Sequence, residues 1–212
     1  MLVAYALTWL GVVAAQASPG PNLAAVASVA LAQGRRPALF VVTGIASGMF
    51  VWSLATALGL GVLIEAFPAS LLLLKLLGGA YLLVLGLRAT RAALRGAGGS
   101  AIAPDARPLG DGAAWRRGLL VLLTNPKAAL MWAAVASFLF GQGLGAPHVL
   151  AFGPMGALSG LAIYGAYALL FSTGAATRGY ARFSRWFEGA FAAAFGAMGA
   201  SLVWSGVREA QR

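Results

Sequence analysis

Two short segments place proline beside amide and cationic side chains inside otherwise apolar stretches of the chain. Because proline removes a backbone donor and clashes with the preceding turn, each segment should interrupt a helix, which then restarts at a proline. The restart exposes free N–H groups and the positive end of a helix, and both favour an anion such as a carboxylate. We therefore predict a substrate-binding site at these breaks, which are Pro19-Gly20-Pro21-Asn22 and Thr124-Asn125-Pro126-Lys127.

Lys127 lies near the middle of the apolar stretch 113–140. A lysine at the centre of a bilayer costs roughly 2.5 kcal/mol on insertion scales, and from there its ammonium reaches neither surface easily. A carboxylate docked between Lys127 and the two helix ends would compensate this charge. Asn22 and Asn125 could add amide groups, and exposed carbonyls could accept from a substrate ammonium. The alternative is structural: the prolines are kinks, and Lys127 pairs with carbonyl groups.

Four further residues are candidates for the same chemistry. Tyr164 and Tyr167 either line the same cavity or belong to the packing between helices. Lys75 lies near the outer end of an apolar stretch, where its ammonium either extends to the interface or lines an exit path. Glu188 follows a cluster of arginines and forms either a surface ion pair or a proton-coupling group. The candidate coupling residues are therefore Lys127, Glu188 and Lys75.

The composition excludes most soluble classes of protein. Of the 212 residues, 60% are hydrophobic and only 9% are charged, and the mean hydropathy is +0.84. A soluble domain carries roughly 25% charged residues, so the solvent of this chain must be lipid. The net charge of +10 does not indicate nucleic-acid binding, because the basic residues form short clusters between long apolar runs. With no cysteines, the chain has neither thiolate metal sites nor disulfides, which argues against a redox enzyme.

The apolar runs predict an all-α integral membrane protein with six transmembrane helices. About 20 apolar residues cross the hydrocarbon core as a helix, and these runs are too long and lack the alternation expected of barrel strands. Residues 88–117 are loop-like, because glycines and Pro104 interrupt them. The predicted spans are residues 2–32, 38–64, 69–87, 113–140, 148–173 and 186–207.

The basic residues predict the orientation in a bacterial inner membrane. Eleven of the 15 lie in the first, third and fifth connections, and the second and fourth connections have none. Because basic loops stay in the cytoplasm, both termini should be periplasmic. A second interpretation of residues 2–15 is the core of a signal peptide with a small-residue cleavage site.

The six spans divide into two sets of three, which must be inverted relative to each other because three is odd. Residues 1–95 form the first three-helix repeat, 96–112 a cytoplasmic linker, and 113–212 the second repeat. The first span of each repeat contains one of the proline breaks, so each repeat has a broken first helix. Paired interruptions at corresponding positions of two halves are a pointer to the binding site of a transporter.

The breaks and several other segments resemble the LysE/RhtB family of amino-acid exporters over nearly the whole chain. The resemblance implies a six-helix bacterial exporter that is driven by the proton motive force. Members often carry aspartate where Asn22 stands, and often an acid near Ser159-Gly160, so coupling here falls to Lys127, Glu188 or the substrate, or transport is facilitated diffusion. The matching segments are Pro19-Gly20-Pro21-Asn22, Gln33-Gly34-Arg35-Arg36, Gly44 with Gly48, residues 74–82 and residues 123–130.

These observations predict a secondary transporter without a cofactor, and not an enzyme. Because no acid lies in the proposed cavity, neutral zwitterions are favoured over cationic amino acids as substrates. Metal efflux is disfavoured, since the spans offer only the peripheral His148 as a ligand. A non-transport role, as a scramblase or assembly factor, is the other alternative. The expected partners are a small-molecule substrate and the bilayer, with homo-oligomers possible and no nucleic acid.

Overall fold

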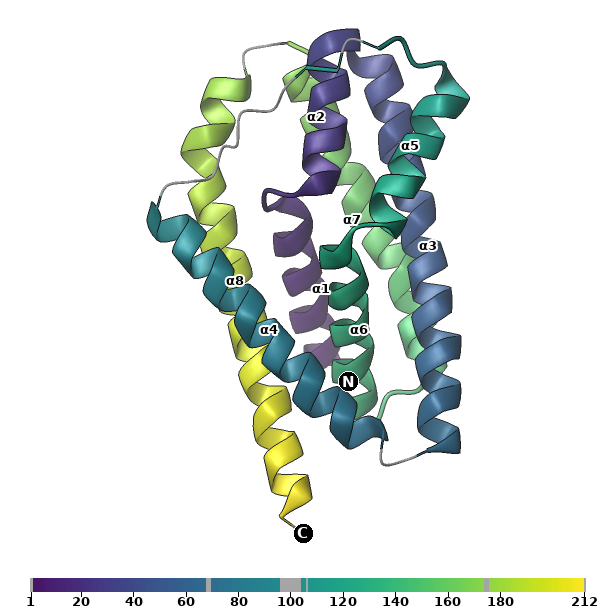
Figure 1. Cartoon of the computed structure of the whole chain (residues 1–212), viewed down its shortest axis with the longest axis vertical. Helices are drawn as coiled ribbons and strands as arrows, with labels where there is room; N and C mark the ends of the chain where they lie inside the picture. Colours follow the sequence, from purple (N-terminus) through teal and green to yellow (C-terminus); the bar gives the residue numbers. More distant parts are fainter. Residues whose placement is uncertain (1, 68–69, 96–103, 106, 174–175, 212) are drawn as a thin grey trace.

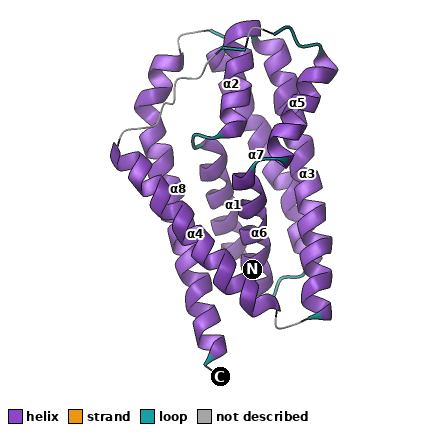
Figure 2. Cartoon of the chain, in the orientation of Figure 1, coloured by secondary structure: helices purple, strands orange, loops and turns teal. Residues whose placement is uncertain are grey.

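Most of the chain that the structure describes is helical. The computed structural model describes residues 2–67, 70–95, 104–105, 107–173 and 176–211, and within them there is no strand (Figure 2). The helices are α1 (Leu2–Ala17), α2 (Pro21–Gln33), α3 (Arg35–Ala66), α4 (Ser70–Arg95), α5 (Asp111–Leu123), α6 (Pro126–Gly141), α7 (Ala146–Phe171) and α8 (Ala176–Ala210).

The helices follow one another up and down along the long axis of the molecule (Figure 1). α1 and α2 run in tandem toward the upper end, α3 returns to the lower end, and α4 rises again. In the second half of the chain the directions are opposite: α5 and α6 descend in tandem, α7 rises and α8 descends. Both chain termini therefore lie toward the lower end of the molecule.

Both proline segments interrupt a helix, as the sequence predicts. α1 ends at Ala17 and α2 begins at Pro21, while α5 ends at Leu123 and α6 begins at Pro126. The second break bends the helix pair by 61°. Each proline occupies the start of a helix, where its missing N–H has no intrahelical acceptor to lose.

The helices reach further into the basic segments than the sequence suggested. α4 continues to Arg95 and α5 begins at Asp111, so the loop-like interpretation of residues 88–117 is wrong for 88–95 and 111–117. α8 begins at Ala176, ten residues before the expected start at 186, so three arginines lie in a helix and not in a loop. Arginine is a good helix former, and its charge marks the end of an apolar stretch without ending the helix. The three are Arg178, Arg182 and Arg185.

Two helices of the described chain are long and apolar enough to cross a membrane by themselves. They are Arg35–Leu60 within α3 and Ala146–Phe171, which is α7. The bent pair of α5 and α6 meets the same criterion as one broken span. α1 and α2 are shorter apolar helices, and basic residues occupy the upper part of both α4 and α8. The leucines that the helices expose, such as Leu77 and Leu158, suit contact with lipid.

Glycine allows α5 to pack directly on α3. A Cβ built on Gly44 would lie 1.9 Å from the Trp115 carbonyl oxygen, and one built on Gly118 would lie 1.9 Å from that of Val41. The two backbones are therefore in contact, which is the close approach that small residues permit between membrane helices. α4 and α8 form a second packed pair (Figure 1).

Candidate functional site

The two helix breaks meet at the same place in the molecule. The Asn125 side chain donates from Nδ2 to Oδ1 of Asn22 over 3.2 Å, and both side chains are buried. Lys127 Nζ lies 2.5 Å from Ser18 Oγ and 3.3 Å from the Pro19 carbonyl oxygen. The first break is thus joined to the second by side chains that the sequence analysis assigned to one site.

A small cavity, of about 30 Å³, lies where the breaks meet. Five of the candidates from the sequence, Gly20, Asn22, Asn125, Lys127 and Tyr164, belong to its lining, whereas Pro19, Pro21 and Pro126 shape the breaks without lining it. Polar groups gather at the breaks, and apolar side chains form much of the remaining wall. The complete lining is Ala15, Gln16, Ser18, Gly20, Asn22, Leu23, Met49, Leu122, Asn125, Lys127, Ala128, Met131 and Tyr164.

The two helix starts differ in how their first N–H groups are satisfied. At α6 the Asn125 side chain caps the helix, because its Oδ1 accepts from the Lys127 backbone N–H over 3.0 Å. At α2 the residue before the helix is Gly20, which has no side chain to cap it. The start of α2, beside the Lys127 ammonium, is therefore the better place for an anion.

The two tyrosines have different roles. Tyr164 lines the cavity and accepts from Asn22 Nδ2 over 3.3 Å. Tyr167 is buried outside the lining, where its hydroxyl donates to the Ala17 carbonyl oxygen over 2.8 Å. That carbonyl lies at the end of α1, so Tyr167 satisfies an acceptor that the break leaves without a helical donor.

Lys75, the second lysine, lies away from this cavity. The residue is only 8% exposed, and its Nζ lies 2.5 Å from Glu209 Oε2 on α8. The sequence analysis did not identify Glu209 as its partner, since 134 residues separate them. Glu188 lies in α8, but its side chain is outside the described residues. No cluster of metal-ligating side chains occurs among the residues that the structure describes.

The sequence analysis did not assign the other eight lining residues to the site, among them Gln16, Ser18 and Met49. Gln16 is 2% exposed, and its Nε2 donates to the Gly156 carbonyl oxygen over 2.9 Å. The signal available was the polarity of Gln16 and Ser18, which stand beside the break at the end of an apolar helix.

Comparison with known proteins decides the family. The LysE type translocator family model matches residues 6–206, which is nearly the whole chain. The chain belongs to the LysE type translocator family. The family resemblance predicted from the breaks and the other matching segments is thereby confirmed, and the chain is a multi-pass membrane transporter, not an enzyme.

Several curated relatives of this LysE type translocator match over most of its length. Proteins named threonine efflux protein, from Salmonella typhi and from Escherichia coli K12, are each 32% identical over 188 residues, covering 89% of this chain and 91% of the relative. An uncharacterized membrane protein from Haemophilus influenzae is 26% identical over 196 residues, covering 91% and 92%. No solved structure shows a significant match.

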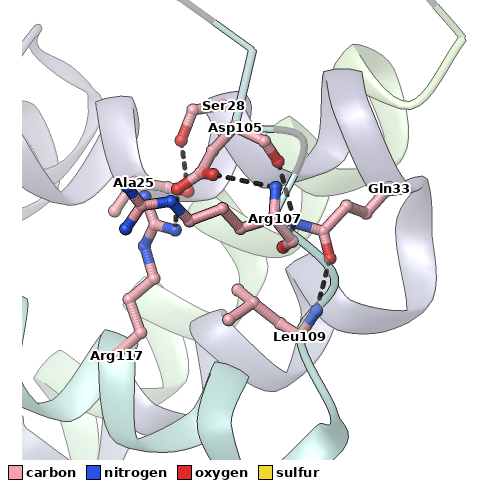
Figure 3. Close-up of polar contacts among 7 residues, drawn as sticks. All are labelled: Ala25, Ser28, Gln33, Asp105, Arg107, Leu109 and Arg117. Carbon is pink, nitrogen blue, oxygen red and sulfur yellow. Dashed lines mark hydrogen bonds and ion pairs between the residues drawn. The ribbon is translucent and has the colours of Figure 1, made fainter.

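A short segment before α5 joins the two halves of this translocator at the upper end (Figure 3). We call residues 104–105 and 107–110 the strap. The Asp105 N–H donates to the Ser28 carbonyl oxygen of α2 over 3.1 Å, and the Asp105 carboxylate pairs with Arg117 of α5. That guanidinium, together with the Arg107 N–H, holds the pKa of Asp105 below its usual value, so the carboxylate is charged at neutral pH.

Gln33, the last residue of α2, uses both ends of its amide to bind the strap. Its Nε2 donates to the carbonyl oxygens of Asp105 over 2.8 Å and Arg107 over 2.5 Å, and its Oε1 accepts from the Leu109 N–H over 2.9 Å. The strap therefore ties α2 to the start of α5 (Figure 3). α2 and α5 both run between a break and the upper end, where the strap contacts them (Figure 1).

Proposed function

We propose that this chain exports small neutral amino acids across the bacterial inner membrane, and that they bind in the cavity between the two breaks. The observation that carries the proposal is the meeting of Lys127, Asn22 and Asn125 around one cavity in the middle of the molecule. The names of the relatives from Salmonella and Escherichia coli support an amino-acid substrate with a small uncharged side chain.

The substrate carboxylate binds at the start of α2, beside the Lys127 ammonium. That ammonium now donates to neutral oxygens, those of Ser18 and Pro19, so a carboxylate that replaces them pairs it with an opposite charge. The carbonyl oxygens at the end of the first break then accept from the substrate ammonium. No acidic side chain occurs among the described residues of the lining, which favours a zwitterion over a cationic substrate.

The transporter is built from two inverted repeats of three spans each, residues 1–95 and 113–212. The opposite directions of the matching helices support this arrangement, as does the position of a break in the first span of each repeat. Transport then follows from alternating exposure of the cavity to the two sides. When the cavity opens to the upper side, the strap must release α2.

The proton motive force drives export in this proposal. Lys127, Lys75 and Glu188 are the candidate coupling residues, and the described part of the cavity lining contains Lys127 alone among them. Because Lys127 also binds the carboxylate, protonation of its amine and binding of the substrate would be coupled. Coupling through Lys127 needs no mid-span carboxylate.

Inverted membrane vesicles test the proposed activity directly. Vesicles that contain the protein should accumulate labelled threonine when energised, and they should accumulate labelled lysine much more slowly. A proton uncoupler should abolish the accumulation. Vesicles from cells without the protein are the control, and equal uptake in both preparations would refute the proposal.

The proposed orientation places both termini in the periplasm and the strap in the cytoplasm. The basic residues at the upper end of the molecule support it, because Arg35, Arg36 and Arg107 all lie there. We expect a phosphatase reporter fused after Gly99 to be inactive, because it would remain in the cytoplasm. The same reporter fused at the C-terminus should be active. The reverse pattern would invert the topology.

A further inference from the structure

Gln16 is a buried polar residue of the cavity lining that the binding of a carboxylate and an ammonium does not use. It lies in the last turn of α1, directly before the break, and is 2% exposed. Its side-chain amide reaches α7, where Nε2 donates to the Gly156 carbonyl oxygen over 2.9 Å and contacts Met49 Sδ at 3.5 Å.

The other end of this amide has no donor. Because Nε2 is held by a carbonyl oxygen, Oε1 is fixed as the group that faces away from Gly156. Among the described residues no hydrogen-bond donor reaches Gln16 Oε1, although the atom is buried. A buried acceptor that lacks a donor is unfavourable, so this position favours a ligand that brings one.

A glycine on α7 preserves the space around the amide. A Cβ on Gly160 would lie 3.0 Å from Met49 Cε, which is crowded, and 3.6 Å from Gln16 Nε2, which is ordinary contact. The wall beside Gln16 is therefore made of Met49 and the backbone of α7. An apolar wall with one free acceptor suits a small, mostly apolar group that carries one donor.

Gln16 and the groups at the breaks contact α7 at different residues. Gln16 binds α7 at Gly156, whereas Asn22 binds it at Tyr164. Both groups line the same cavity, and in the proposed pose the carboxylate and ammonium do not occupy the wall formed by Gln16 and Met49. A substrate whose carboxylate and ammonium bind at the breaks therefore points its side chain toward Gln16.

We propose that Gln16 determines substrate specificity, because its Oε1 accepts a hydrogen bond from a hydroxyl on the side chain of a small neutral amino acid. This inference rests on the proposed function and adds the class of side chain that the site selects. An apolar wall alone discriminates weakly between similar groups, whereas a buried acceptor disfavours an analogue that leaves it unpaired. Gln16 thus distinguishes a hydroxyl from a methyl group of the same size.

Threonine and valine form the matched pair of substrates for the test, since a methyl group in valine replaces the hydroxyl. In inverted vesicles the wild-type protein should transport threonine at least about tenfold faster than valine at low substrate concentration, the value of one hydrogen bond. Gln16→Met keeps the length of the side chain and removes the acceptor. It should bring the two rates within about threefold of each other, chiefly by slowing threonine.

Gln142→Met is the control variant, because Gln142 is exposed after α6 and does not line the cavity. It should keep the wild-type ratio. Equal rates for threonine and valine in the wild type would overturn the inference without any variant. So would a Gln16→Met protein that slows both substrates by the same factor, since a structural role predicts that result. Vesicles that transport no neutral amino acid would instead refute the proposed function, and this inference with it.

Discussion

Replacing Lys127 with methionine should reduce amino-acid export about 100-fold, since a charge-assisted hydrogen bond contributes roughly 1.5–3 kcal/mol and 1.4 kcal/mol is a factor of ten. Lys127 is the cation of the cavity lining, and methionine keeps its length without its charge. The variant should insert normally, because removing a charge from an apolar stretch lowers the cost of insertion. Initial rates of threonine uptake in inverted vesicles, normalised to the amount of protein, measure the effect.

Two further variants separate binding from folding. Lys127→Arg keeps the positive charge but not its compact shape, so we expect partial export. Arg116→Met removes a cation of α5 that is exposed and does not line the cavity, and it should export at close to the wild-type rate. If Lys127→Met exports as fast as Arg116→Met, Lys127 does not bind the substrate.

A covalent bond between the strap and α2 should block transport almost completely, because the proposed cycle requires them to separate. Asp105 N and Ser28 O are only 3.1 Å apart, which brings the two residues within reach of a disulfide. The chain has no cysteines of its own, so the double variant Ser28→Cys, Asp105→Cys contains the only two thiols. Oxidation should reduce threonine uptake at least about tenfold, and reduction should restore it.

The single variants and the redox state together provide the controls. Ser28→Cys alone and Asp105→Cys alone should be insensitive to the oxidant, which excludes a general effect of oxidation on the vesicles. The extent of cross-linking can be followed by labelling the remaining thiols. A fully cross-linked protein that transports at the rate of its reduced form would show that the strap stays docked throughout the cycle.

The helix breaks could be predicted from the sequence, because the effect of proline on a helix is local. Pro21 and Pro126 begin helices because proline suits the first position of a helix in any sequence. The matched positions of the breaks predicted that Asn22 and Lys127 lie close together, and both line the same cavity. The start of α8 was missed, because arginine ends an apolar stretch without ending a helix.

Contacts between distant residues were beyond a single sequence. Gln16 binds a carbonyl 140 residues away, Gln33 binds a strap more than 70 residues away, and Lys75 pairs with Glu209 across 134 residues. Each depends on which helices become neighbours, and apolar periodicity in a helix with many small residues does not specify that. Polar residues beside a break were the available indication for Gln16 and Ser18.

The direct contact of Gly44 and Gly118 with the backbone of the opposite helix gives α3 and α5 little freedom to slide, so they should act as a fixed frame during transport. α2 differs, because it lies between the non-helical residues 18–20 and Gly34, whose φ of 82° is a conformation suited to glycine. Because α2 has a non-helical connection at each end, it can rotate as a rigid helix relative to α3 and α5. In the proposed transport cycle, we therefore expect α2 to be the helix that moves when the cavity opens to the upper side.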